Sequence, residues 1–201
     1  MVGVCWHRQA GVVTEPGEEL PCQLSELRTL QLHDIWPLAF FTRNVAASLP
    51  QLRSVCLCDC RVDSPDGLPW FPDEVLRVPS VERLELIRLP MYHLPDMREL
   101  PALRTLVVSD GPQLSAVPML PGFFGGATRL THLSLRNTPV DEEDIAETIL
   151  EMPHLKELRL DFWGDESSVF WAATLQRRLQ GRCSVWPASE HLLLDWAGDD
   201  W

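Results

Sequence analysis

The residues most suggestive of chemistry lie in one short stretch, Cys56-x-Cys58-x-Cys60. Alternate residues of an extended strand share a face, so Cys56 and Cys58 would present two thiols close enough to ligate one metal ion. No second cysteine pair and no histidine at ligand spacing completes a tetrahedral site. We therefore expect no metal site here and interpret these cysteines as structural or incidental.

The other nucleophiles and bases form no catalytic pattern either. The histidines are scattered, and no serine or cysteine lies in a GxSxG context. The glycines of 122–126 lack the pattern of a phosphate-binding loop, and the acidic run 141–144 lacks the spacing of a calcium loop. The run is better explained as the first turn of a helix, where carboxylates complement the helix dipole. We expect no enzyme and no cofactor, and a hydrolase is the least favoured function.

Composition and charge narrow the partner classes. Lys and Arg number 17 against 29 Asp and Glu, a formal net charge of -12, which argues against nucleic acid because phosphate binding depends on basic side chains. No apolar run is long enough to span a membrane, and His7, Arg8 and Gln9 interrupt the apolar N-terminus too early for a secretory signal. Six cysteines in a chain with an adequate core indicate reduced thiols. We expect an intracellular protein, cytoplasmic or nuclear, that is monomeric outside its complex with a protein partner.

The cysteines lie in one copy of an apolar pattern that the chain repeats at offsets 0, 3 and 5. Its six copies are Leu27/Leu30/Leu32, Leu52/Val55/Leu57, Val81/Leu84/Leu86, Leu103/Leu106/Val108, Leu130/Leu133/Leu135 and Leu155/Leu158/Leu160. Their starts lie 25, 29, 22, 27 and 25 residues apart. A proline stands two residues before four of these starts, at Pro50, Pro79, Pro101 and Pro153. Because proline cannot continue a helix, it separates each return segment from the next strand.

The segments between the predicted strands carry short helical patterns. These are Val45–Leu49, Asp73–Val78, Met97–Leu100 and, most clearly, Asp141–Met152. A helix over about 167–180, with Trp171, Leu175 and Leu179 on one face, and a strand near 183–186 would cap the last edge. We divide the chain into an irregular N-terminal segment, 1–19, a repeat domain, 20–186, and an acidic tail, 187–201.

The repeat resembles the leucine-rich repeat superfamily, of ribonuclease-inhibitor-like type. Its strand consensus is LxxLxLxxN/C-x-L, which the second repeat matches fully through Cys60 and Val62. At the Asn/Cys position the other repeats place Ile35, Leu89, Gly111, Thr138 and Trp163. The resemblance implies an α/β fold, a leucine-rich repeat solenoid forming an open right-handed arc with parallel strands on the concave side and short helices and loops outside. It also implies that Cys60 tethers the turn after its strand.

Two subfamilies share these degenerate repeats. Residues 130–138 and 152–160 resemble the repeat region of fungal F-box proteins, which implies a non-enzymatic protein–protein interaction module, such as the substrate-recognition part of an F-box-type ubiquitin ligase adaptor. No F-box helices are recognisable in the chain. Residues 103–114 resemble the leucine-rich repeat sensor region of plant nucleotide-binding immune receptors, which is the alternative.

The candidate binding surface is the concave face, formed by the residues between the core leucines. These positions mix both charges with small and apolar side chains, which suits a protein partner, although a solvated face with no single partner would look the same. Cys56 and Cys58 are predicted to be exposed thiols on this face. The candidate protein-binding residues are Gln31, His33, Cys56, Cys58, Arg83, Glu85, Val107, Ser134, Arg136, Arg159 and Asp161.

Overall fold

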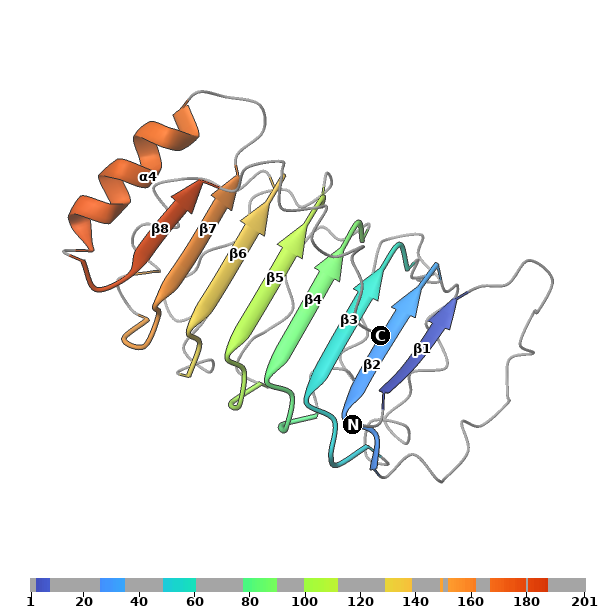
Figure 1. Cartoon of the computed structure of the whole chain (residues 1–201). Coiled ribbons are helices and arrows are strands. Elements are labelled where there is room, and N and C mark those ends of the chain that lie inside the picture. The colour runs from blue at the N-terminus through green and yellow to red at the C-terminus, as the bar shows by residue number, and fades with distance from the viewer. Residues whose placement is uncertain are drawn as a thin grey trace, which may run out of the picture.

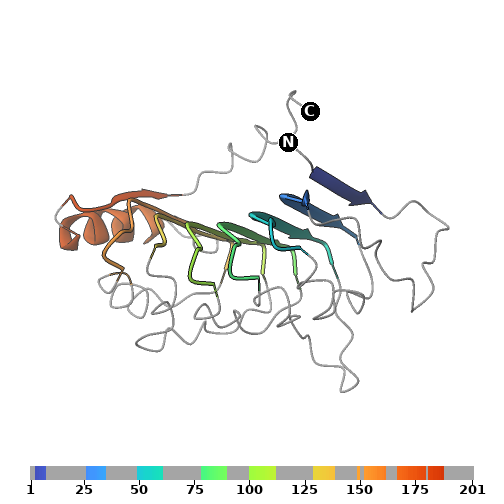
Figure 2. The same cartoon turned by 90° about the horizontal axis from the view of Figure 1, so that it is seen from below.

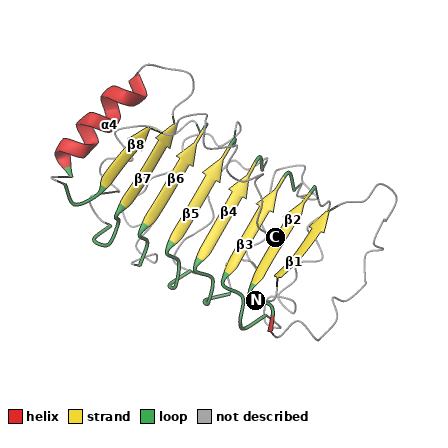
Figure 3. Ribbon diagram, in the orientation of Figure 1, coloured by secondary structure: helices red, strands yellow, loops and turns green. Residues whose placement is uncertain are grey.

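A computed structural model shows one parallel sheet whose strands follow each other in chain order (Figures 1 and 3). It describes residues 3–7, 26–34, 49–60, 78–89, 100–111, 129–138, 149, 152–161, 167–179 and 181–187. The strands are β1 (Gly3–His7), β2 (Thr29–His33), β3 (Ser54–Cys58), β4 (Arg83–Ile87), β5 (Thr105–Ser109), β6 (His132–Arg136), β7 (Glu157–Asp161) and β8 (Ser184–Pro187), and helix α4 (Ser167–Arg178) lies between β7 and β8 in sequence.

All repeats pair in one register. Leu30 lies opposite Val55, Val55 opposite Leu84, and Leu84 opposite Leu106, so that equivalent positions stack across the sheet. The same alignment continues through β6 and β7 to β8. Figure 2 shows that the row of strands bends gently. The chain therefore forms an open, solenoid-like α/β fold, as the repeat spacing predicts.

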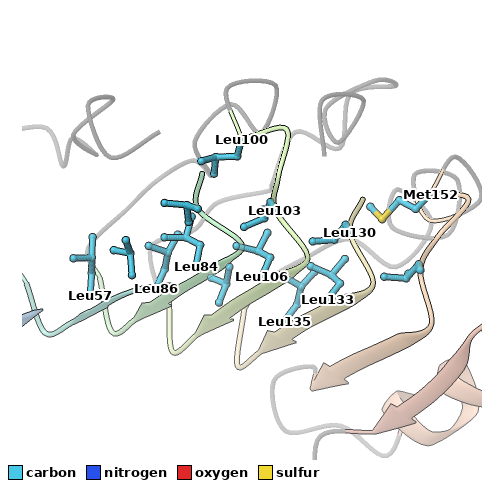
Figure 4. Close-up of a cluster of buried hydrophobic side chains, with 14 of the residues drawn as sticks. Leu57, Leu84, Leu86, Leu100, Leu103, Leu106, Leu130, Leu133, Leu135 and Met152 are labelled. Carbon is cyan, nitrogen blue, oxygen red and sulfur yellow. The ribbon is translucent and has the colours of Figure 1, made fainter. Parts of the chain in front are cut away.

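The core lies on one face of the sheet. The leucines and valines at offsets 0, 3 and 5 are at most 6% exposed, and those of β3 to β6 are at most 1% exposed. Figure 4 shows Leu84, Leu106 and Leu133 on the same side of neighbouring strands. Burying such a side chain contributes roughly 1.5–3 kcal/mol, so the stack supplies the main stabilisation. Met152 and Leu100 close this core at the turns that precede the strands.

The four prolines occupy equivalent tight turns at the start of the repeats. In each turn the N–H of the first core residue donates to the carbonyl three residues earlier, as from Leu52 to Leu49 at 3.1 Å and from Leu103 to Leu100 at 3.0 Å. Proline then stands at the second turn position, where its fixed φ is favoured. The prolines thus lie in turns directly before the strands, as predicted, whereas most of the return segments lie outside the described residues.

The residue after each of five strands adopts a left-handed backbone conformation. Its φ lies between 48° and 55° in every case, at Asp34, Asp59, Arg88, Asp110 and Asn137. In the first four, the N–H donates to the last carbonyl of the next strand at 2.9–3.0 Å. Asp and Asn tolerate this conformation well, which explains four of the five residues.

Cys60 secures the turn that follows β3. The side chain has no exposed surface, and its Sγ donates to the carbonyls of Leu32 and Cys58, each at 3.4 Å. One thiol thus joins two neighbouring repeats. The tethering role implied by the consensus is confirmed for Cys60.

β1 departs from the prediction for the N-terminus. The sequence predicts an irregular segment over residues 1–19, whereas residues 3–7 pair with β2 in the common register, Val4 opposite Leu30 and Trp6 opposite Leu32. The signal was present in the sequence. Met1, Val4 and Trp6 carry offsets 0, 3 and 5, and Met1 stands 26 residues before Leu27, within the spacing of the other repeats.

The C-terminal cap forms as predicted. α4 packs on β8, and Leu175 and Leu179 join the leucine core. The amide of Val185 donates to Oε1 of Gln176 at 2.8 Å, so a helix side chain satisfies part of the last strand. Gly181, with φ of 75°, provides the left-handed residue that follows the helix.

The other expected helices fall mostly outside the described residues; they are Val45–Leu49, Asp73–Val78, Met97–Leu100 and Asp141–Met152. In the last of them, Ile149 is helical and buried. The predicted handedness of the arc and the predicted domain boundaries at residues 20 and 187 also involve segments outside the described residues. Within the described part of the chain, no helix has the length and apolar character needed to cross a membrane.

Candidate functional site

The candidate surface is the face of the sheet opposite the leucine core, which we call the polar face. It consists of offsets 2, 4 and 6 of each repeat, on β2 to β7. Leu57 has no exposed surface and belongs to the core cluster, whereas Cys56 and Cys58 are absent from that cluster. The predicted strand register is therefore correct.

The register places the predicted residues in adjacent rows. The central row runs Gln31, Cys56, Glu85, Val107, Ser134 and Arg159. A second row, nearer the strand ends, runs His33, Cys58, Ile87, Ser109, Arg136 and Asp161. Arg83 belongs to the third row, beside Ser54 and Thr105. The side chain of Asp161 is outside the described structure.

The predicted exposure of Cys56 and Cys58 is wrong. Cys56 is 9% exposed and Cys58 is 5% exposed. The cause is the length of the neighbouring side chains: Cys56 lies between Gln31 and Glu85 in the central row. Neighbouring strands are about 4.8 Å apart, so longer flanking side chains cover a short one.

The same effect covers other short side chains of the polar face. Ser134, between Val107 and Arg159, is 8% exposed, and Ser109, between Ile87 and Arg136, is 6% exposed. Glu85 is long but only 5% exposed. The other described candidate residues are half-buried: Gln31, His33, Arg83, Val107, Arg136 and Arg159.

Several charges on the polar face are paired within their own strand. Arg83 Nε donates to Oε1 of the buried Glu85, two residues along β4. Arg159 Nε donates to Oε1 of Glu157 at 2.6 Å, and Nε2 of His132 lies 3.5 Å from the other oxygen of Glu157. Residues two apart on a strand share a face, which makes the pairs within β4 and β7 possible. His132 meets Glu157 across neighbouring strands, because the two residues are register partners. These pairs hold long side chains in fixed positions.

Arg88 forms a bidentate ion pair with Asp59 of the preceding repeat and was not among the predicted binding residues. Its Nε and Nη2 donate to the two oxygens of Asp59 at 2.7 and 2.5 Å, and Nη2 also lies 3.1 Å from Cys58 Sγ. The Arg88 hydrogen bonds hold the pKa of Asp59 below its usual value. Both side chains are about half exposed, so the pair contributes no more than about 1 kcal/mol. The sequence does contain a signal for this pair, because Asp59 and Arg88 have opposite charges at the same offset of adjacent repeats.

Two polar atoms on β6 are buried without a hydrogen-bond partner among the described residues: Ser134 Oγ and Arg136 Nε. They belong to residues two apart, and therefore lie on the same face. Each leaves a hydrogen-bonding group unsatisfied in a desolvated position, which costs roughly 1–3 kcal/mol. Asp110, which directly follows β5, accepts hydrogen bonds from Ser109 at 2.7 Å and from Asn137 at 2.8 Å.

Burial raises the pKa values of three of the described cysteines. Desolvation raises the pKa of Cys56 to about 12 and those of Cys58 and Cys183 to about 11. Unfolded thiols lose their protons near pH 9, whereas these folded thiols keep them. Folding is consequently favoured less as the pH rises above 9.

We predict that at pH 8 these thiols react with a disulfide reagent at least about 100-fold more slowly than free cysteine, because the thiolate is the reacting species. The rate should rise steadily with pH up to about 11. The measurement uses a C5S/C22S variant, so that the four cysteines described as buried and free are read alone. Unfolding in guanidinium chloride, as control, should release all four. Full reaction of the native protein at pH 8 would contradict the burial of these thiols.

Within the described residues, no group of three or more His, Cys, Asp or Glu side chains could hold a metal ion. The polar face offers hydrogen-bond donors, paired charges and a half-buried apolar pair, Ile87 and Val107. Comparison of the whole chain with protein-family models and with curated protein sequences gives no match.

Proposed function

We propose that this chain is a non-enzymatic protein-binding module of the leucine-rich repeat superfamily, which recognises its partner through the polar face. The observation that carries the proposal is the common register of β2 to β7, which turns that face into one ordered array of side chains. Ion pairs within β4 and β7 fix part of the array. A rigid, pre-ordered surface loses little conformational entropy on binding.

The centre of the polar face supports this assignment. Ile87 and Val107 are diagonal neighbours on β4 and β5, and both remain half-buried. Paired charges and polar side chains surround them, including Arg83 with Glu85 and Arg159 with Glu157. An apolar centre within a polar rim is the usual anatomy of a protein interface.

Within the superfamily, we propose the substrate-recognition role of fungal F-box-type ubiquitin ligase adaptors. The support is the resemblance of residues 130–138 and 152–160 to that repeat region, together with the tight apolar–Pro–x–apolar turns of the repeats. The protein would act inside the cell, with the partner held by the sheet and no chemistry performed on it.

Replacing Val107 by arginine tests the proposal. The extra length and charge at the centre of the polar face should abolish capture of proteins that the unchanged chain retains from a cell extract. H154R is the matched control, because His154 is exposed in a turn before β7 and lies off the polar face. Equal loss in the two variants, or no loss in V107R, would contradict recognition through this face.

A further inference from the structure

The two unsatisfied polar atoms of β6 mark a specific place on the polar face. Ser134 is 8% exposed, and its Oγ has no hydrogen-bond partner among the described residues. Arg136 is half-buried, and its Nε is likewise covered and unpartnered there. Residues two apart on a strand are about 6.6 Å apart and point to the same side. Two desolvated groups that can donate therefore face the same small region.

We propose that Ser134 and Arg136 form a subsite for a carboxylate on an acidic segment of the partner protein. Arg136 can only donate, and its Nε with one terminal nitrogen forms the planar fork that matches the two oxygens of a carboxylate. The Ser134 hydroxyl can donate to one of the same oxygens. The inference rests on the proposed function and names the chemistry that the polar face selects.

The neighbouring charges leave this arginine available. Arg159 Nε is engaged with Glu157, and Arg83 Nε with Glu85. Asp110 accepts hydrogen bonds from Ser109 and Asn137. Asp161 is the register neighbour of Arg136, and its side chain is not described. Among the described arginines of the polar face, Arg136 is the one whose Nε is buried without a hydrogen-bond partner. A carboxylate of the partner protein would therefore gain most binding energy at this residue.

Val107 gives the subsite an apolar side. It lies beside Ser134 in the central row and next to Ile87 on the diagonal. An acidic side chain that enters against Val107 would lose water on one flank while it meets the donors on the other. Low local polarity strengthens a charge-assisted hydrogen bond. The Arg136 side chain must turn outward to admit the ligand, since its Nε is covered in the free protein.

The test follows the Arg136 Nε–H resonance by NMR in the full chain during titration with a blocked glycyl-glutamyl-glycine peptide. We expect a saturable shift, and none with the glutaminyl peptide of the same length. S134A should weaken binding roughly three- to tenfold, the loss of one hydrogen bond. It should also raise the thermal unfolding midpoint, because the unsatisfied hydroxyl is gone. R136Q should abolish the peptide's effect on the backbone amides of Val107 and Ser134.

R129Q is the charge-matched control, since Arg129 is exposed in the turn before β6, and it should bind the peptide like the unchanged chain. Equal shifts with the glutaminyl peptide, no shift at all, or tighter binding of inorganic phosphate would overturn the inference.

The chain's own acidic tail is the competing source of carboxylates. If the full-length E190Q/D195N/D199N/D200N variant alone shifts the Arg136 resonance, the subsite is filled from within and a partner's carboxylate is the wrong assignment. Loss of capture by V107R with no response to the glutamyl peptide would leave the proposed function standing and remove this subsite.

Discussion

Leu106→Ala is expected to lower the free energy of unfolding by about 3 kcal/mol, within the roughly 2–5 kcal/mol range for buried leucines. Leu106 has no exposed surface and lies on β5, near the middle of the sheet. The same side of the sheet holds Leu84 on one neighbouring strand and Leu133 on the other. Truncation therefore leaves a cavity that touches three repeats. Because stability in such arrays depends on interfaces between neighbours, the loss should appear in the whole transition.

The adjacent residue provides the control. Val107 points to the polar face and is half-buried, so Val107→Ala should cost no more than about 1 kcal/mol, since a partly exposed side chain loses less burial. Denaturant unfolding followed by circular dichroism measures both variants. Similar losses for the two residues would mean that the sheet does not have one core face and one solvent-facing side. This outcome would contradict both the register and the proposed interface.

The fold could be predicted because the core signal is redundant. The pattern of offsets 0, 3 and 5 recurs six times, and the prolines mark the same period on their own. β1 was not predicted because Met1, Val4 and Trp6 replace the leucines of the pattern. Its strand is recognised only when the spacing of 26 residues to Leu27 is counted.

The polar face was harder to predict than the core. Alternation in a strand fixes the direction of a side chain, which placed Cys56, Ser134 and Glu85 on the correct face. It does not fix exposure, which depends on the length of neighbouring side chains 22 to 29 residues away in sequence. Cys58 shows this clearly: His33 and Ile87 flank it, and Arg88 reaches its sulfur at 3.1 Å. Periodicity alone cannot supply these contacts.

The second large effect is expected at the buried carboxylate of Glu85. Arg83→Met should lower the free energy of unfolding by about 2 kcal/mol, because it leaves a buried charge without the arginine that compensates it. The Glu85 side chain is 6% exposed, whereas that of Arg83 is 39% exposed. Water already screens the arginine, and for this reason the expected loss is below the roughly 3–5 kcal/mol seen when a fully buried pair is broken.

The exposure difference predicts an asymmetric mutant cycle. Glu85→Gln should cost under about 1 kcal/mol, since the remaining arginine is partly solvated and the amide keeps an acceptor for it. Adding Glu85→Gln to Arg83→Met should recover about 1 kcal/mol of the loss, because the unpaired charge is removed. Unfolding in urea of the four proteins measures the cycle. If Arg83→Met and Glu85→Gln cost the same and their effects simply add, the carboxylate does not depend on Arg83. The Arg83–Glu85 ion pair would then not be the interaction that orders this part of the polar face for partner binding.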